Sequence, residues 1–160
     1  MCPAESPTGA DPTLGSRFAG FVVRPGFTWA SAAPIVGLAP SVLSRWERLL
    51  LDRAGFDLGS TLSFADLVGL AALGATVRCL GAGADGFVVG LARLFEALRD
   101  RADVERLDGY AALVGHDSGR LAERYDHERC AAADILVVPL RPILADFRGQ
   151  VFASSIGAKV

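Results

Sequence analysis

The clearest pattern in the chain is a pair of neighbouring stretches in which apolar residues recur with the period of an α-helix. Between residues 64 and 80 the recurring positions are Leu70, Leu73, Val77 and Leu80. Between residues 87 and 101 they are Val88, Leu91, Leu94, Phe95 and Leu98. Intervals of three and four residues place side chains on one helix face, so both stretches are predicted to be helical. Ser63 is a suitable N-cap for the first helix, with Asp66 at its third position.

The segment between these helices, CLGAGADGF, contains the spacing G-x-G-x-x-G at Gly81, Gly83 and Gly86. A dinucleotide site needs such glycines after a strand, and an acidic residue at the end of a second strand. Here the preceding pattern is helical, and no strand leads into Asp103 or Glu105, which lie at a suitable distance. We therefore interpret the glycines as a corner between two helices, where glycine frees the backbone to turn.

Two shorter helices are predicted upstream of this pair. Thr28 is a candidate N-cap for a helix that ends near Gly37, a residue type that suits a left-handed turn. Pro40 opens the next helix at the position where proline is best tolerated, and we expect that helix to reach about Leu51. Residues 52–63 then predict a hairpin or a loop with glycines at its bends.

The last third of the chain changes character. YAALVGHDSGRLAERY predicts a hairpin around a turn-rich tetrad, DILVVPL a short buried strand, and PILADFRGQVFASS a closing helix. The fold class is therefore predicted to be mainly α, with an α+β C-terminal region. The helix over 63–80 is apolar nearly all round, so either this C-terminal region or a second subunit must bury it.

The helix that begins at Pro40 has two contrasting faces. One face is apolar and carries Val42, Leu43, Trp46, Leu49 and Leu50. The opposite face carries Ser41, Ser44, Arg45 and Arg48. A short helix with such a front fits the DNA major groove, where arginine reaches guanine edges or phosphates and serine contacts either. A helix, a glycine turn and a second helix of this kind form a helix-turn-helix.

The stretch VGLAPSVLSRWERLLL resembles the MerR-type winged helix-turn-helix, in which Pro-Ser and an aromatic-Glu-Arg segment follow the turn. Ala33, Gly37, Leu43 and Trp46 fall where such domains place the small residue, the turn glycine and the buried apolar residues. LSFADLVGL and VRCLGAGADGFVVGLARLFEAL are similar to that family's segments after the wing, so the resemblance covers roughly residues 27–98. The predicted hairpin around GHDSGRL, the strand after it and Gly149–Gln150 are similar to a small C-terminal domain on MerR-like antitoxins and regulators.

Prolines, glycines and scattered polar residues predict a flexible tail over residues 1–20. The resemblance implies a winged helix-turn-helix over 21–80 and a dimerisation or partner-binding region over 81–160. It also implies DNA contacts by four residues of the recognition helix and one residue of the wing, namely Ser41, Ser44, Arg45, Arg48 and Arg53. We expect a cytoplasmic transcriptional regulator that binds double-stranded DNA as a homodimer. No enzyme activity, cofactor, metal or membrane association is expected.

Three alternatives stay open. An antitoxin would bind operator DNA through the same half and a toxin through the C-terminal half. A protein–protein adaptor would have a helix-turn-helix that no longer meets DNA, which the low basic charge and Pro34 inside the first helix favour. Finally, the helix with the Ser/Arg face is an ordinary surface helix if that face is simply solvated.

The composition of the chain does not distinguish among these alternatives, but it limits where DNA could bind and which compartment suits the protein. The chain has 160 residues, 51% of them apolar, and a net charge of −2, so any DNA contact must be local. The odd number of cysteines (Cys2, Cys79 and Cys130) favours free thiols in a reducing compartment, with Cys79 expected in the core. We identify no secretory signal, and the most apolar stretch is interrupted by Asp66 and Arg78.

Two histidine-containing clusters are predicted to be structural. His116, Asp117 and Ser118 are consecutive in a turn, whereas a catalytic triad needs side chains that converge from separate elements. His127 and Cys130 have a spacing that one metal could use, but too few further ligands exist for a closed zinc site.

Overall fold

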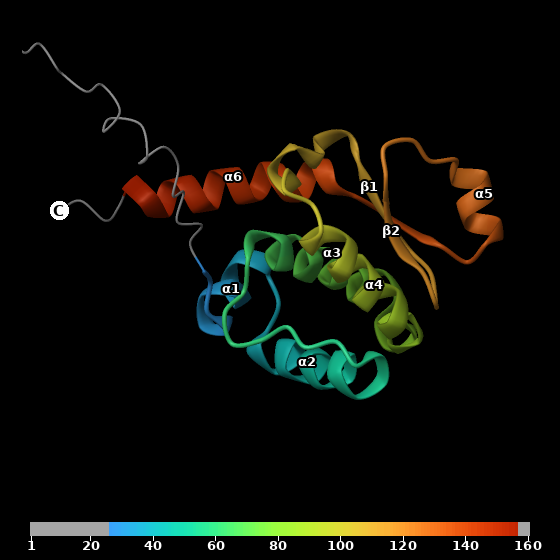
Figure 1. Cartoon of the computed structure of the whole chain (residues 1–160), viewed down its shortest axis with the longest axis horizontal. Helices are drawn as coiled ribbons and strands as arrows, with labels where there is room; N and C mark the ends of the chain where they lie inside the picture. The colour runs from blue at the N-terminus through green and yellow to red at the C-terminus, as the bar shows by residue number, and fades with distance from the viewer. Residues whose placement is uncertain (1–25, 157–160) are drawn as a thin grey trace, which may run out of the picture.

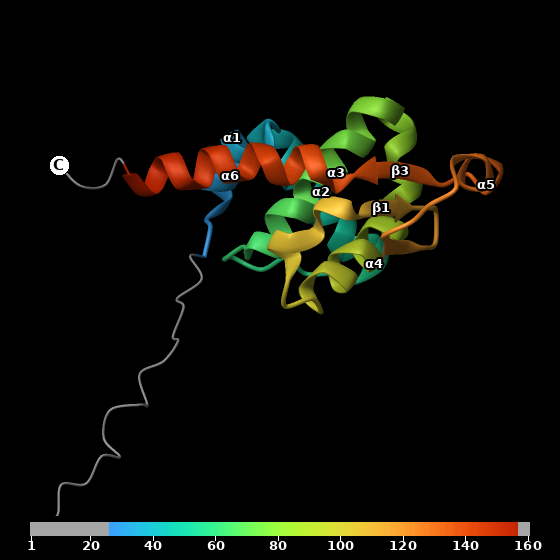
Figure 2. The ribbon, with the colours of Figure 1, turned by 90° about the horizontal axis from the view of Figure 1, so that it is seen from above.

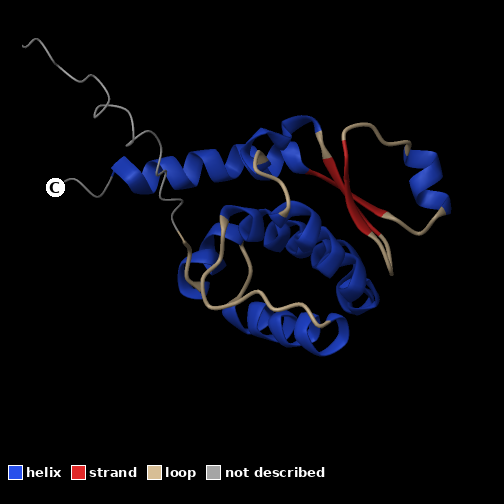
Figure 3. Cartoon of the chain, in the orientation of Figure 1, coloured by secondary structure: helices blue, strands red, loops and turns tan. Residues whose placement is uncertain are grey.

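Helices make up most of this chain, and a small sheet lies between the fourth helix and the fifth (Figures 1 and 3). The computed structural model describes residues 26–156. The elements are α1 (Trp29–Val36), α2 (Pro40–Ala54), α3 (Phe64–Leu80), η1 (Gly81–Phe87), α4 (Val88–Arg99), η2 (Val104–Gly109), β1 (Ala111–Val114), β2 (Gly119–Ala122), α5 (His127–Ala132), β3 (Leu136–Pro139) and α6 (Leu140–Ile156). The predicted class, mainly α with a small β component, is confirmed. The predicted tail over 1–20 lies outside the described residues.

Helix α1 is short and well capped at both ends. The Thr28 hydroxyl accepts a hydrogen bond from the Ser31 amide at 3.2 Å, and the Ser31 hydroxyl accepts one from the Thr28 amide at 3.0 Å. Gly37 ends the helix in the left-handed region, with φ of 66°. Both predicted caps are confirmed, and Pro34 is accommodated on the exposed side of this eight-residue helix.

Helix α2 begins at Pro40 as predicted but extends three residues beyond the expected end. Gly55, with φ of 64°, terminates it. Arg53 therefore lies in the last turn of α2, and its predicted position in a wing is wrong. Residues 55–63 form a loop rather than a hairpin, and their one backbone bridge joins Leu62 to Phe27.

Helix α3 forms the centre of the core. The Ser63 hydroxyl accepts from the Asp66 amide at 3.2 Å, and the Asp66 carboxylate accepts from the Ser63 amide at 2.8 Å, which confirms the predicted capping box. Helices α1, α4 and α6 and strand β3 pack around α3, so elements of the same chain bury most of it. The last turn of α3 extends beyond the core, and Cys79 is exposed there. The prediction that Cys79 is a core thiol was therefore wrong.

The residues Phe64–Arg99 are long and apolar enough, by length and composition alone, to cross a membrane. This is weak evidence for a span because a core helix passes the same test. In this structure the stretch is two helices that pack on one another through a 3₁₀ corner, with the Phe95 ring against Gly69. Of its most apolar window, 56% is buried inside the protein.

The sheet is antiparallel, with β1 between β2 and β3. Ala112 and Val114 face the main core with α3 and α4, and the alternate residues Ala111 and Leu113 form a second, smaller cluster with Cys130 of α5. Figure 2 shows the sheet beside α4, with α5 standing apart at its far side. The predicted hairpin, the third strand and the closing helix with a proline near its start are confirmed.

The hairpin turn between β1 and β2 is joined to the glycine-rich corner. The His116 carbonyl accepts a hydrogen bond from the Gly90 amide at 3.1 Å and so caps α4, which lacks a side-chain cap. The His116 ring stacks on Phe87 with centroids 4.4 Å apart, and its Nδ1 lies 3.0 Å from the Gly86 carbonyl oxygen. The glycines of η1 thus serve a packed helix corner, as predicted.

Candidate nucleic-acid interface

Helix α2 is anchored to the core through one face. Leu43, Trp46 and Leu50 are at most 2% exposed, so the predicted anchoring role of Trp46 agrees with its burial. The opposite face is exposed along its whole length and carries four of the predicted DNA-contacting residues, Ser41, Ser44, Arg45 and Arg48. The sequence period therefore assigned the two faces of this helix correctly.

Arg48 occupies the middle of the exposed face. Its Nε donates to the Ser44 carbonyl oxygen at 3.4 Å, which is long for a hydrogen bond. The two terminal nitrogens of its guanidinium have no partner among the described residues. Arg48 is therefore the arginine of α2 that is best placed to engage an external anion.

Arg45 and Arg53 are engaged by the glycine-rich corner. Arg45 forms an ion pair of 2.5 Å with Asp85 of η1, and Arg53 donates to the Asp85 carbonyl oxygen at 3.3 Å. The side chains of Arg45 and Asp85 are 55% and 27% exposed, so solvent still reaches the pair. Sequence reasoning missed Asp85 because it lies 40 residues from Arg45, and no local pattern indicates such a contact.

Asp85 changes the electrostatics of the α2 surface. The three arginines of α2 are balanced by its acidic residues Glu47 and Asp52 together with Asp85. The Asp85 oxygen that does not meet Arg45 is buried and has no hydrogen-bond partner among the described residues. The exposed face is thus rich in donors but close to neutral overall.

The N-terminus of α2 faces solvent without a side-chain cap. The Ala39 side chain provides no hydrogen bond to the first turn, and Ala39, Pro40 and Ser41 are all exposed. Pro40 has no amide hydrogen, and the Val42 amide donates to the Ala39 carbonyl oxygen at 2.9 Å, so the helix start presents the Ser41 amide and a partial positive charge. A phosphate oxygen can therefore be accommodated at this end of the exposed face.

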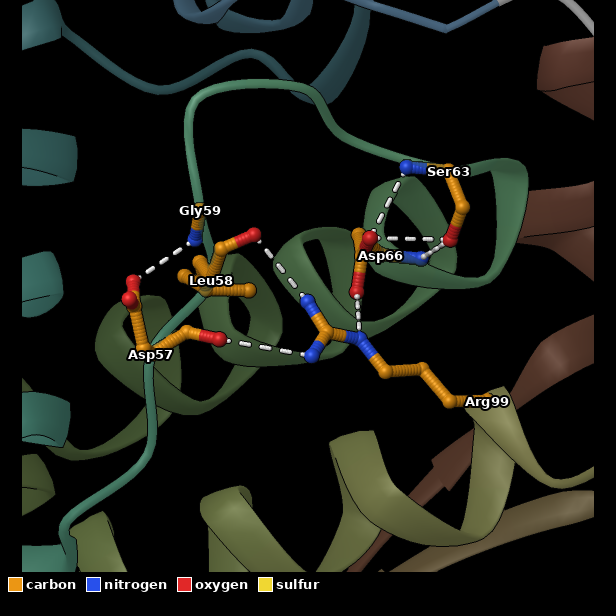
Figure 4. Close-up of polar contacts among 6 residues, drawn as sticks. All are labelled: Asp57, Leu58, Gly59, Ser63, Asp66 and Arg99. Carbon is orange, nitrogen blue, oxygen red and sulfur yellow. Dashed lines mark hydrogen bonds and ion pairs between the residues drawn. The ribbon is translucent and has the colours of Figure 1, made fainter.

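A second polar cluster joins the loop before α3 to the end of α4 (Figure 4). Arg99 Nε lies 2.7 Å from one Asp66 oxygen, while the Ser63 amide and hydroxyl each donate to the other at 2.8 Å. The remaining Arg99 nitrogens donate to the Asp57 and Leu58 carbonyl oxygens at 3.3 and 3.1 Å. We call this group of residues the Arg99 clasp.

The Arg99 clasp is a structural feature. The Asp66 side chain is 3% exposed, and both of its carboxylate oxygens are bonded. The guanidinium also lies over the Phe56 ring at 4.8 Å. A cavity of about 330 Å³ adjoins the clasp, but the polar atoms of Asp66 already point at partners in the protein. The clasp therefore holds the loop 55–63 in place beside α2.

One surface ion pair shifts the acid–base behaviour of its members. Arg101 donates to the Asp103 carboxylate at 3.0 and 3.3 Å. These hydrogen bonds lower the pKa of Asp103 below its ordinary value and raise the pKa of Arg101. Both groups lie outside any candidate site.

The remaining candidate clusters behave as turns and helix ends. Asp126 caps α5 by accepting hydrogen bonds from the amides of Glu128 and Arg129, so it belongs to a helix start. Within the described part of the chain, no three metal-ligating side chains gather. Comparison of this chain with family models, curated proteins and solved structures found no match.

Proposed function

We propose that the protein binds double-stranded DNA through a helix-turn-helix formed by α1 and α2. The observation that carries the proposal is the placement of α2. It follows α1 after a three-residue turn, is anchored from behind by Trp46, and presents a serine and arginine face to solvent. A helix of this size with such a face is suited to the major groove.

In this proposal Arg48 makes the central contact, to a guanine edge or a phosphate. Ser41 and Ser44 contact bases or the backbone nearer the N-terminus of α2, the end that usually meets base edges. Arg45 reaches DNA when it exchanges Asp85 for a phosphate, and Arg53 lies against the backbone at the far end of the helix. Because Asp85 competes for Arg45, a single copy binds weakly, and two copies on two half-sites are needed.

The wider proposal is a MerR-like transcriptional regulator that works in the cytoplasm as a homodimer. In this proposal the loop 55–63, whose Asp57 and Leu58 carbonyl groups are held by Arg99, serves in place of a wing hairpin. The C-terminal region, with its sheet and α6, provides the dimerisation or partner surface. A toxin bound at that surface would make the same protein an antitoxin.

A second candidate is a protein–protein adaptor, and the contact between Asp85 and Arg45 favours it. An arginine already paired inside its own chain contributes less to phosphate neutralisation, which drives much of DNA binding. The adaptor would use the same exposed face of α2 for a protein partner. The adaptor hypothesis expects that no DNA sequence is enriched when the protein is mixed with a DNA library.

One experiment separates these candidates. The full chain is titrated against a labelled genomic DNA library at two salt concentrations. The DNA proposal expects enrichment of palindromic sites and an affinity that falls as salt rises. Replacement of the central arginine, Arg48→Ala, should weaken binding about tenfold or more, the usual effect of losing one base contact.

Arg93→Ala is the matched control because Arg93 is an exposed arginine on α4, outside α2 and outside the sheet and α6. It should leave the affinity within about twofold of the original, as expected for a residue outside the contact surface. Absence of any enriched site, or equal losses in both variants, would contradict the DNA proposal. The first of these outcomes supports the adaptor.

A further inference from the structure

A cavity of about 710 Å³ lies on the outer face of the sheet, away from α2 and from the helical core. Its floor is apolar and includes Leu113 of β1, Cys130 of α5 and Ile135, which precedes β3. Its walls carry Arg120, Arg124, Tyr125, Asp126, Arg129 and Ala133. None of the DNA-contacting residues proposed above belongs to this cavity.

The chain topology creates this cavity. Strands β2 and β3 flank β1 on opposite sides, so the segment 123–135 between them must cross one face of the sheet. That segment carries α5 across the face that the helical core does not cover, as Figures 1 and 2 show. The register places Arg120 directly opposite Leu113, and paired residues project to the same face. Arg120 therefore stands on the cavity side of the sheet.

Three arginines from three different segments converge on this cavity: Arg120 from β2, Arg124 from the connection and Arg129 from α5. All three are exposed, and no guanidinium among them has a hydrogen bond or an ion pair with any described residue. Asp126 is the one carboxylate in the lining, and one of its oxygens caps α5. The lining therefore has an excess of positive charge in a protein whose net charge is −2.

We propose that this cavity binds a small organic anion, a molecule with a phosphate or carboxylate group attached to an apolar body. Guanidinium groups bind both oxyanions through paired, charge-assisted hydrogen bonds. The apolar body would lie on Leu113, Ile135 and Cys130. The volume falls within the range of about 300–1,000 Å³ that is typical of small-molecule sites.

Phenyl phosphate is a suitable probe because it combines both features. Binding to the full chain is measured by isothermal titration calorimetry and by two-dimensional NMR of isotope-labelled protein. Inorganic phosphate should bind more weakly because it lacks the ring, and neutral benzyl alcohol should not bind measurably. Benzoate, compared with phenyl phosphate, distinguishes a carboxylate site from a phosphate site.

Arg120→Gln and Arg129→Gln should each weaken phenyl phosphate binding about tenfold, the usual loss when one charge-assisted contact is removed. Arg141→Gln is the matched control, since this arginine is exposed but lies outside the cavity lining. It should change the affinity by less than about twofold. Because the two cavity arginines have no partners within the described residues, their replacement should leave the fold intact.

The NMR map of the unsubstituted protein tests the location independently of any variant. Shifts confined to residues near the cavity, including Leu113, Arg120 and Cys130, support the proposal. The proposal is overturned if neither anion binds, if the shifts lie elsewhere, or if both glutamine variants bind phenyl phosphate as tightly as Arg141→Gln. Binding of an acidic peptide without binding of either small anion also overturns it, in favour of a protein partner. These outcomes do not depend on whether the protein binds DNA, so the cavity proposal and the DNA proposal can fail separately.

Discussion

Two of the arginine–aspartate pairs that join distant parts of this chain have different surroundings, namely Arg99–Asp66 and Arg45–Asp85. In the Arg99 clasp, Asp66 is 3% exposed, and every carboxylate oxygen meets a donor. In the contact between α2 and η1, Arg45 is 55% exposed, and one oxygen of Asp85 has no partner among the described residues. The aspartate of the clasp therefore has hydrogen-bond partners for both carboxylate oxygens, whereas Asp85 has them for one oxygen among the described residues.

The difference indicates which pair maintains the fold and which can exchange partners. Removing one member of a buried pair leaves a charge that the protein cannot solvate, so the pair resists change. An exposed pair contributes little to stability, because water and ions can replace either partner. The clasp is therefore structural, and the pair of Arg45 and Asp85 is available to an external anion.

The largest effect is expected from Arg99→Met, which keeps most of the side-chain volume and removes the charge. It leaves Asp66 buried without its cation and frees two carbonyl groups, and should lower the free energy of unfolding by about 3 kcal/mol. Urea denaturation measures this loss. Arg93→Met on the same helix, where the arginine pairs with exposed Glu96, should cost no more than about 0.5 kcal/mol. Equal costs would remove the distinction between buried and exposed pairs.

A smaller effect is expected from Ser63→Ala. This change removes the hydroxyl that accepts from the Asp66 amide and donates to its carboxylate, but it leaves Arg99 in place. The loss of an N-cap side chain should cost about 1 kcal/mol, again measured by urea denaturation. A cost as large as that of Arg99→Met would show that the cap, rather than the ion pair, dominates the clasp.

Asp85→Asn should change stability by no more than about 1 kcal/mol, since solvent reaches the pair through the 55% exposed side chain of Arg45. Under the DNA proposal the same change releases Arg45, so affinity for DNA should rise and become more dependent on salt, by about one unit of the logarithmic salt slope. Fluorescence anisotropy at several salt concentrations measures both quantities. Unchanged or weaker DNA binding by a folded variant would argue that Arg45 does not meet DNA.

The smallest effect concerns the surface pair of Arg101 and Asp103. Because the pKa of Asp103 is lowered in the folded state, the pair stabilises the protein above the ordinary pKa of 3.8 and loses that effect as pH falls through the lowered value. Asp103→Asn should therefore give a slightly lower melting temperature at neutral pH, and the difference should vanish in strong acid. A difference in melting temperature that grows on acidification would contradict the lowered pKa of Asp103.

Local signals in the sequence predicted the parts of the fold that depend on local chemistry. Thr28 and Ser63 were identified as caps because their hydroxyls need only the amides three positions ahead. The end of α2 was placed too early because its last turn is polar on the exposed side, where periodicity provides no signal. Gly55, which terminates the helix, was the residue that could have corrected this.

The contacts that define the candidate sites could not be predicted in the same way. Arg45 meets Asp85 and Arg99 meets Asp66 across separations of 40 and 33 residues, and such pairings depend on how helices pack. The exposure of Cys79 depends on where α3 leaves the core, which its apolar composition does not reveal. The arginine-lined cavity arises from strand order, a property of the whole C-terminal region.

The close approach of α4 to the hairpin has a mechanical consequence. A Cβ at Gly90 would lie 1.9 Å from the Gly115 carbonyl oxygen, and one at Gly119 would lie 1.9 Å from the Gly90 carbonyl oxygen, so bare backbones touch here. Side chains between two elements can change rotamer and absorb a small shift, but touching backbones cannot. Gly119 is the chain neighbour of Arg120. A displacement of Arg120 that moves the Gly119 backbone would therefore also move the backbone of α4 at Gly90.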